Sequence, residues 1–213
     1  MNTAPLQSSS TLHHHPVGLS ADGTALGDGA ARDALRQAMH QLSEAELVEG
    51  NHRAPAMCQA LTEAARALAG LHAYGPAESH LAQALHWALQ MGGHDLAADL
   101  HCAWAEVATN AADLADAHGE PARCRAARDR ARDHAFEAAR LADLATDPNW
   151  EIRLLLRASD VLDRCGDHDD SVLLQQRALV LMGMGQADLP ADDPLRAGPA
   201  LDAAPLTAPG ALM

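Results

Sequence analysis

Residues that favour β-strands are almost missing from this chain of 213 residues. Aromatic residues make up 2%, Val occurs at only six positions, and Ile152 is the single isoleucine. A sheet needs β-branched and aromatic side chains on its pleated surface. Ala, Leu, Arg, Gln and Glu, which dominate here, favour helices instead. Because hydrophobic residues still reach 48%, a core can form, and the composition predicts an all-α protein.

Proline and glycine divide the middle of the chain into predicted helices. Proline is favoured at the first position of a helix, and glycine is favoured just after its end. The prolines that precede runs rich in Ala and Leu are Pro55, Pro76, Pro121 and Pro148. The glycines that follow such runs are Gly75, Gly92, Gly93, Gly119 and Gly166. This punctuation predicts seven helices, near residues 29–48, 54–73, 76–91, 94–118, 120–146, 148–165 and 167–182.

The two ends of the chain differ in composition from its middle. Residues 1–28 are rich in Ser, Thr, Gly, Pro and His, and residues 183–213 contain five prolines. Neither segment shows helical periodicity, so both are predicted to be disordered tails on a helical domain over residues 29–182. We find no signal-peptide pattern and no apolar run long enough to span a membrane. With four widely spaced cysteines that fit reduced thiols, this predicts a cytoplasmic protein without a membrane partner.

The glycines that close successive helix pairs recur at similar intervals. Gly75, Gly119 and Gly166 are separated by 44 and 47 residues, and a recurring helix–turn–helix of this length is typical of an α-solenoid. The segment LLRASDVLDRCGDHDDSVLLQQRALVL, residues 155–181, has small residues at set places around its Gly-Asp turn. They are Ala158 and Ser159 before the turn, Ser171 early in the second helix, and Ala178 followed by Leu179 late in it.

This pattern resembles the tetratricopeptide repeat. Residues 81–108 resemble the junction between units in the longer tetratricopeptide-like repeats of bacterial signalling and regulatory proteins, so the resemblance covers roughly residues 54–182. It implies a right-handed α-solenoid of antiparallel helix pairs. It also implies a non-enzymatic scaffold or adaptor that binds a peptide or helix of another protein in a groove lined by helices 54–73, 94–118 and 148–165. The candidate groove residues are His101, Glu106, Asn110, Arg153 and Arg157.

An arginine-rich stretch offers a second candidate surface. Residues 120–140 contain six Arg and four acidic residues, whereas the whole chain has a net charge of −14. Arg125, Arg128 and Arg132 fall on one helix face and could bind carboxylates of an acidic partner. The alternative is a set of ordinary ion pairs on a solvated face. The overall negative charge argues against a nucleic-acid partner, because phosphate binding needs positive charge.

Thirteen histidines invite an enzymatic interpretation, which the motifs do not support. The chain has no HExxH, no GxSxG and no phosphate-binding glycine loop. His134 and Glu137 share a helix face, but the sequence shows no third ligand, so we assign no catalytic residue, metal or cofactor. Two alternatives to a scaffold remain open: a small secretion chaperone and a His-dependent metalloenzyme. A homodimer formed by the outer helices is a separate expectation, because no capping helix follows residue 182.

Residues 164–171, RCGDHDDS, concentrate one thiol, one imidazole and three carboxylates. We interpret this stretch as a turn between helices rather than a metal site. Gly166 is expected to end one helix in a left-handed conformation. Asp167 is expected to cap the next helix through its side chain, so Asp167→Ala should cost about 1 kcal/mol of stability without affecting metal content.

Overall fold

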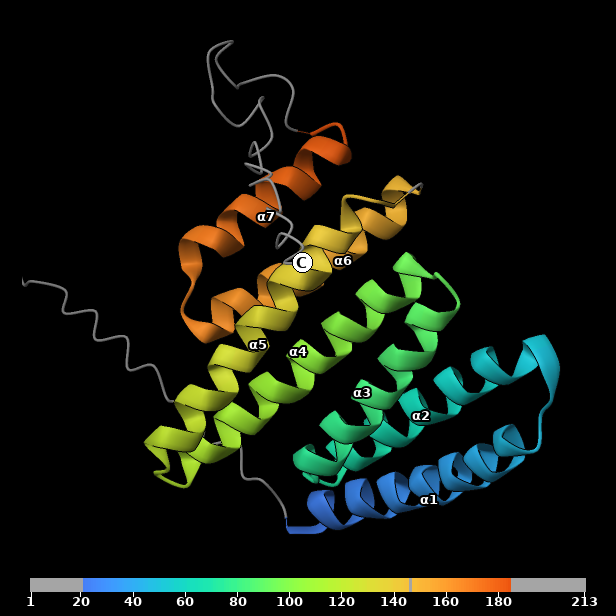
Figure 1. The fold of residues 1–213 in the computed structure, drawn as a ribbon. Coiled ribbons are helices and arrows are strands. Elements are labelled where there is room, and N and C mark those ends of the chain that lie inside the picture. Colours follow the sequence, from blue (N-terminus) through green and yellow to red (C-terminus); the bar gives the residue numbers. More distant parts are fainter. Residues whose placement is uncertain (1–20, 146, 185–213) are drawn as a thin grey trace, which may run out of the picture. The chain divides into compact units, whose positions relative to one another are not determined.

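The computed structural model describes the backbone of residues 21–145 and 147–184, with side chains from residue 29 onward. Within these residues the chain forms seven α-helices and one short 3₁₀ helix, η1, and contains no strand, which confirms the all-α fold class (Figure 1). The elements are α1 (Ala21–Glu46), η1 (Gly50–His52), α2 (Arg53–Gly70), α3 (Tyr74–Gln90), α4 (His94–Ala117), α5 (Pro121–Ala142), α6 (Pro148–Cys165) and α7 (His168–Leu181).

The helices divide into two compact units with a boundary between Met91 and Gly92. In the first unit, α2 packs against both α1 and α3. In the second unit, α4 packs against α5 and α6, and α6 also packs against α5 and α7. The sequence predicted a single repeat domain over residues 29–182 and did not mark this division.

The helix boundaries lie close to the predicted ones, with the largest difference at the first helix. It begins at Ala21 rather than near residue 29, inside the predicted N-terminal tail. Residues 1–20 of that tail, and all of the predicted C-terminal tail except Gly183 and Met184, lie outside the described residues. Among the helices that are described, none combines the length and hydrophobicity needed to cross a membrane.

Three turns with the same hydrogen bonds join α2 to α3, α4 to α5, and α6 to α7. Each has one residue with positive φ, and these residues are spaced 47 apart: His72 (57°), Gly119 (68°) and Gly166 (92°). In every turn this residue donates its N–H to the carbonyl three residues earlier, at 2.9–3.0 Å. The next residue donates to the carbonyl five residues earlier, at 2.8–2.9 Å. This is the Schellman arrangement that satisfies the last carbonyls of a helix.

The predicted role of Gly75 was wrong. Gly75 lies in the first turn of α3, without a positive φ, and the left-handed residue that ends the preceding helix is His72. An L-residue adopts this conformation less readily than glycine, so the sequence pattern pointed to the nearest glycine instead. With His72 in its place, the repeat is 47 residues in both intervals. Pro121 and Pro148 do occupy first helical positions, whereas Pro55 and Pro76 are the third residues of α2 and α3.

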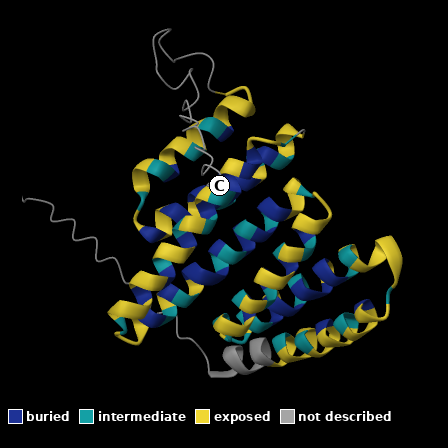
Figure 2. Ribbon diagram, in the orientation of Figure 1, coloured by how far each residue is buried: buried dark blue, intermediate teal, exposed yellow. Residues whose placement is uncertain are grey.

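Small buried residues recur at equivalent places in the three helix pairs. Counted from the left-handed residue, they lie seven residues before it and five and twelve residues after it. All nine are buried, with exposed fractions of 4% or less, as the dark-blue inner faces in Figure 2 illustrate. The residues are Ala65, Ala77 and Ala84; Ala112, Cys124 and Ala131; and Ser159, Ser171 and Ala178. Small side chains at these points let the two helices of each pair approach closely, so the pairs are repeats of one packing unit.

Candidate functional site

Polar side chains recur at three equivalent positions on the first helix of every pair. These positions lie thirteen, nine and six residues before the left-handed turn residue, and none of the nine side chains is buried. They are Gln59, Glu63 and Arg66 on α2; Glu106, Asn110 and Asp113 on α4; and Arg153, Arg157 and Asp160 on α6. We call this set the polar stripe. Because the spacing follows the helical period, each helix presents its three members on one face.

Ion pairs and hydrogen bonds join α4 to α6 within the second unit, and one of them links two stripe residues. Arg157 donates through Nε to Glu106 Oε1 at 2.8 Å and through Nη1 to Asp99 Oδ1 at 2.9 Å. Trp150 also donates its indole N–H to Asp99, at 3.3 Å. Arg164, further along α6, donates to Asn110 Oδ1 at 2.9 Å and to Asp113 Oδ2 at 2.6 Å.

These contacts fix the spacing between α4 and α6 while leaving charged atoms in water. The side chains of Asp99, Glu106 and Asp113 stay between 42% and 54% exposed. Arg153 and Asp160 are exposed and form no ion pair within the described part of the chain. The face formed by α4 and α6 therefore presents positively and negatively charged side chains that can donate and accept hydrogen bonds.

Two of the three arginines on the predicted face of α5 contact other parts of the protein instead of facing water. Arg132 forms two hydrogen bonds to the carboxylate of Asp167, one of them at 3.0 Å, and one to Asp129 at 3.1 Å. Arg128 is half-buried, and its Nε is buried without a hydrogen-bond partner among the described atoms. Of the three arginines of this face, Arg125 alone is exposed to water.

The Arg132 contacts also correct the interpretation of Asp167. It occupies the N-cap position of α7, as predicted, but its side chain makes no capping hydrogen bond there. Its two carboxylate oxygens accept from the Arg132 guanidinium instead. Among the described N-cap residues, the one whose side chain forms a capping hydrogen bond is Asp147, which accepts from the backbone N–H of Asn149 at 3.0 Å.

His101, a predicted groove residue, lies against His134 rather than on the polar stripe. Their Nδ1 atoms are 2.9 Å apart, so one ring donates a hydrogen bond and the other accepts it. Trp104 stacks on His134 with 4.2 Å between the ring centroids. Burial, reinforced by the neighbouring His101, lowers the pKa of His134 to about 4, and burial also lowers the pKa of His101. Both rings are therefore neutral near pH 7, and the shared hydrogen bond requires one of the two Nδ1 atoms to carry no proton.

The sequence did not reveal this pair, because its members are 33 residues apart on α4 and α5. The only signal was the presence of His101 and Trp104 in the apolar pattern of residues 94–118. Among the described residues, no group of three or more His, Cys, Asp or Glu side chains is placed to hold a metal ion. Burial raises the pKa of the Cys102 thiol to about 12, which removes it as a thiolate nucleophile.

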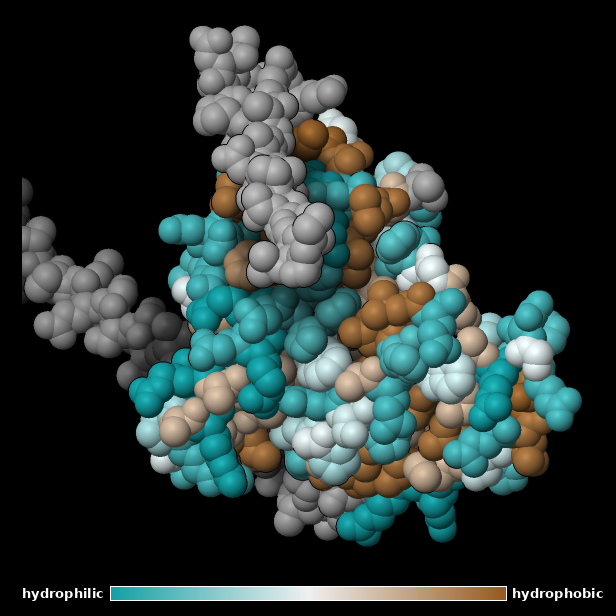
Figure 3. Space-filling view, viewed as in Figure 1, coloured by the Kyte–Doolittle hydropathy of each residue, from teal (hydrophilic) through white to brown (hydrophobic). Residues whose placement is uncertain are grey.

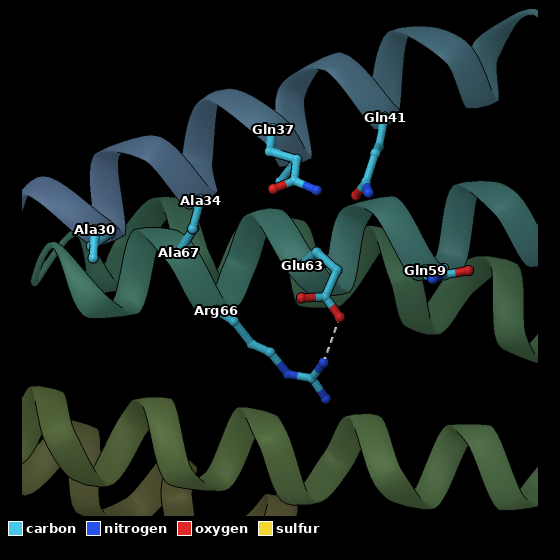
Figure 4. A pocket seen from close by; sticks show the side chains of 10 residues that line it. Ala30, Ala34, Gln37, Gln41, Gln59, Glu63, Arg66 and Ala67 are labelled. Carbon is cyan, nitrogen blue, oxygen red and sulfur yellow. Dashed lines mark hydrogen bonds and ion pairs between the residues drawn. The ribbon is translucent and has the colours of Figure 1, made fainter.

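A shallow groove of about 490 Å³ lies between α1 and α2 in the first unit. Alanines line much of it, and Gln37 and Gln41 extend from α1 toward α2 (Figure 4). Three stripe residues, Gln59, Glu63 and Arg66, line its other side, and Arg66 donates to Glu63 at 2.7 Å. The groove thus gives the polar stripe of α2 a concave setting that the sequence did not predict.

The chain was also compared with protein families and with curated proteins. No family model matches the sequence, and no curated protein matches it.

Proposed function

We propose that this protein is a non-enzymatic, tetratricopeptide-like scaffold, and that the polar stripe of α4 and α6, within the second unit, binds a segment of another protein. The observation that carries the proposal is the recurrence of exposed or half-buried polar residues at the same three positions of α2, α4 and α6. The surrounding buried positions hold small residues that repeat with the same 47-residue period. Helix pairs that repeat with a polar face on the first helix suit the right-handed solenoid that the tetratricopeptide-like resemblance suggests.

The chemistry of the second unit indicates what the segment should carry. Arg153 offers an exposed guanidinium, and Asn110 and Asp160 offer an amide and a carboxylate on the same face. An extended peptide presents backbone N–H and C=O groups to such side chains, and an acidic residue in it can pair with Arg153. We therefore propose an extended protein segment with at least one carboxylate as the partner.

Reduced thiols support a cytoplasmic setting for this interaction. All four cysteines, Cys58, Cys102, Cys124 and Cys165, are free and buried. A chain that keeps every thiol unpaired suits a reducing compartment. We propose that the scaffold acts in bacterial regulation or assembly, the setting that the tetratricopeptide-like resemblance suggests.

The test compares two charge reversals of the full chain. Arg153→Glu changes the polar stripe of α6, whereas Arg125→Glu makes the same change at an exposed position on α5. Each tagged variant and the wild type are used to capture proteins from the native cytosol, with quantitative mass spectrometry of the captured proteins. We expect the wild type and Arg125→Glu to capture the same partner protein. Arg153→Glu should capture at least tenfold less of it.

Three results would contradict the proposal. Equal capture of the partner by all three proteins would exclude the polar stripe as its binding site. Loss of the partner from Arg125→Glu alone would place the binding site on the arginine face of α5. A partner destined for export would favour the secretion chaperone over the scaffold. Metal analysis of the untagged full chain addresses the metalloenzyme alternative, because one tightly bound metal ion per chain would favour it over a pure scaffold.

A further inference from the structure

The outer face of α7 exposes four aliphatic side chains to water. Val172, Leu173, Leu179 and Val180 are between 40% and 47% exposed. At about 100° per residue they fall within roughly 120° of the helix circumference, opposite the buried Ser171 and Ala178. Figure 3 shows brown side chains at the C-terminal end of α7. A helix that is apolar on both faces is normally covered on both.

Repeat packing does not explain this apolar face. The equivalent positions on α5, 47 residues earlier, carry three exposed side chains and one half-buried one, and most of them are charged. They are Arg125, Ala126, Arg132 and Asp133, in the place of Val172, Leu173, Leu179 and Val180. The same surface of the repeat is therefore mostly charged on α5, where Arg132 pairs with Asp167, and hydrophobic on α7, so the apolar face is particular to α7.

The sequence of this face reads the same in both directions about Gln176. Val172 and Leu173 precede Gln176 by four and three residues, and Leu179 and Val180 follow it by three and four. A two-fold axis through Gln176 would place Leu173 beside Leu179 of a second copy and Val172 beside its Val180. The two exposed Gln176 amides would meet at the axis, where each can donate and accept a hydrogen bond. A symmetric dimer needs this kind of self-complementary surface.

The charges around α7 favour the antiparallel arrangement. Asp169 and Asp170 lie in its first turn, and antiparallel packing separates them from their symmetry mates by the length of the helix. Parallel packing would bring these like charges together. The one cation of α7, Arg177, forms ion pairs inward to Asp143 and Glu151. The outer face is therefore free of charge between residues 172 and 180.

We propose that the outer face of α7 binds a second copy of this chain, with the two α7 helices antiparallel about an axis at Gln176. One pair of short helices makes a small interface, so the dimer dissociates on dilution. Dimerisation through α7 is independent of what binds the polar stripe.

Sedimentation velocity of the full chain tests the dimer. We expect the measured mass to rise with concentration from 22.4 kDa toward twice that value. Leu173→Glu alone and Leu179→Lys alone should each shift the protein to monomer, since a charge would enter an apolar contact. The double variant should recover the dimer, because each introduced carboxylate would face an introduced ammonium group of the other copy. Ala126→Glu, the equivalent change on α5, should leave the dimer intact.

Cross-linking tests the axis. Gln176→Cys should form an intermolecular disulfide under mild oxidation, while the four native cysteines are buried. Circular dichroism checks that every variant keeps its helices. A monomer at the highest soluble concentration, or a dimer that both single charge variants leave unchanged, would overturn the proposal. So would a monomer in which α7 is strongly protected from hydrogen exchange, because another part of the same chain would then cover the face.

Discussion

His101 and His134 show how two side chains can make stability depend on pH. The unfolded rings titrate near the ordinary value of 6.5, whereas the pKa of His134 in the folded protein is about 4. Between these values the unfolded chain binds a proton that the folded chain does not, so stability falls as pH drops from 6.5 to 4. The carboxylates of Glu137 and Asp133 act to raise the pKa values of these rings, whereas the guanidinium groups of Arg130 and Arg140 act to lower them.

We therefore expect the wild type to lose about 1 kcal/mol of stability between pH 7 and pH 5 through this pair, after allowing for solvent screening. Urea unfolding at the two pH values measures the loss. His134→Gln should shrink the difference, whereas the exposed His118→Gln should preserve it. An unchanged difference in His134→Gln would show that the pair does not control the pH response.

The Arg132–Asp167 pair can be separated from helix capping by a double-mutant cycle. Because Asp167 accepts from Arg132 rather than from the backbone of α7, Asp167→Ala and Arg132→Ala should remove the same interaction. We expect a coupling energy of about 1 kcal/mol from chemical denaturation of the two single variants and the double variant. The exposed pair Glu137–Arg140, treated in the same way, should give only a few tenths of a kcal/mol. Zero coupling for Arg132 and Asp167 would restore the capping interpretation.

The sequence located individual candidate residues better than it located their partners. Glu106 and Arg157 were both selected as groove residues, and the structure joins them directly. The contacts of Arg132 and His101 were missed because their partners lie 35 and 33 residues away, on other helices. Helical periodicity gives the direction of a side chain on its own helix, but the neighbour that it meets depends on packing.

At the scale of helices and turns, local chemistry decided most boundaries. Pro121 and Pro148 begin helices, and Gly119 and Gly166 end them, because these residue types suit the backbone at those points. The turn at His72 escaped prediction because an L-residue occupies the left-handed position. Its hydrogen bonds match those of the glycine turns, so the repeated packing fixes this conformation in spite of the residue.

Gly75→Ala and Gly166→Ala form a matched test of the turn assignment. A Cβ atom at either glycine would meet nothing within 4 Å, so the two sites differ in backbone conformation rather than in space. Gly75→Ala should stabilise the protein by about 0.5 kcal/mol, because it replaces glycine within a helix. Gly166→Ala should destabilise it by about 1 kcal/mol, because Ala is strained at positive φ. Thermal and urea unfolding measure both; a loss of stability in Gly75→Ala would return the left-handed role to Gly75.

At the scale of the whole molecule, composition was enough to predict the fold class, because the chain has too few β-branched and aromatic residues to form a sheet. The repeat was also visible, although with the wrong first interval. The division at Met91 was not visible, since Gly92 and Gly93 look like any other helix break. The apolar face of α7 was hidden for a related reason. Its Val and Leu residues resemble core residues until the structure shows which side of the helix is covered.

Hydrogen exchange of the full chain with its captured partner tests the central claim most directly. If the polar stripe is the binding surface, peptides covering residues 94–117 and 148–165 should exchange more slowly in the complex than in the free protein. Peptides from α5 should show little change. Slower exchange confined to α5 or α7, with α4 and α6 unaffected, would contradict the account.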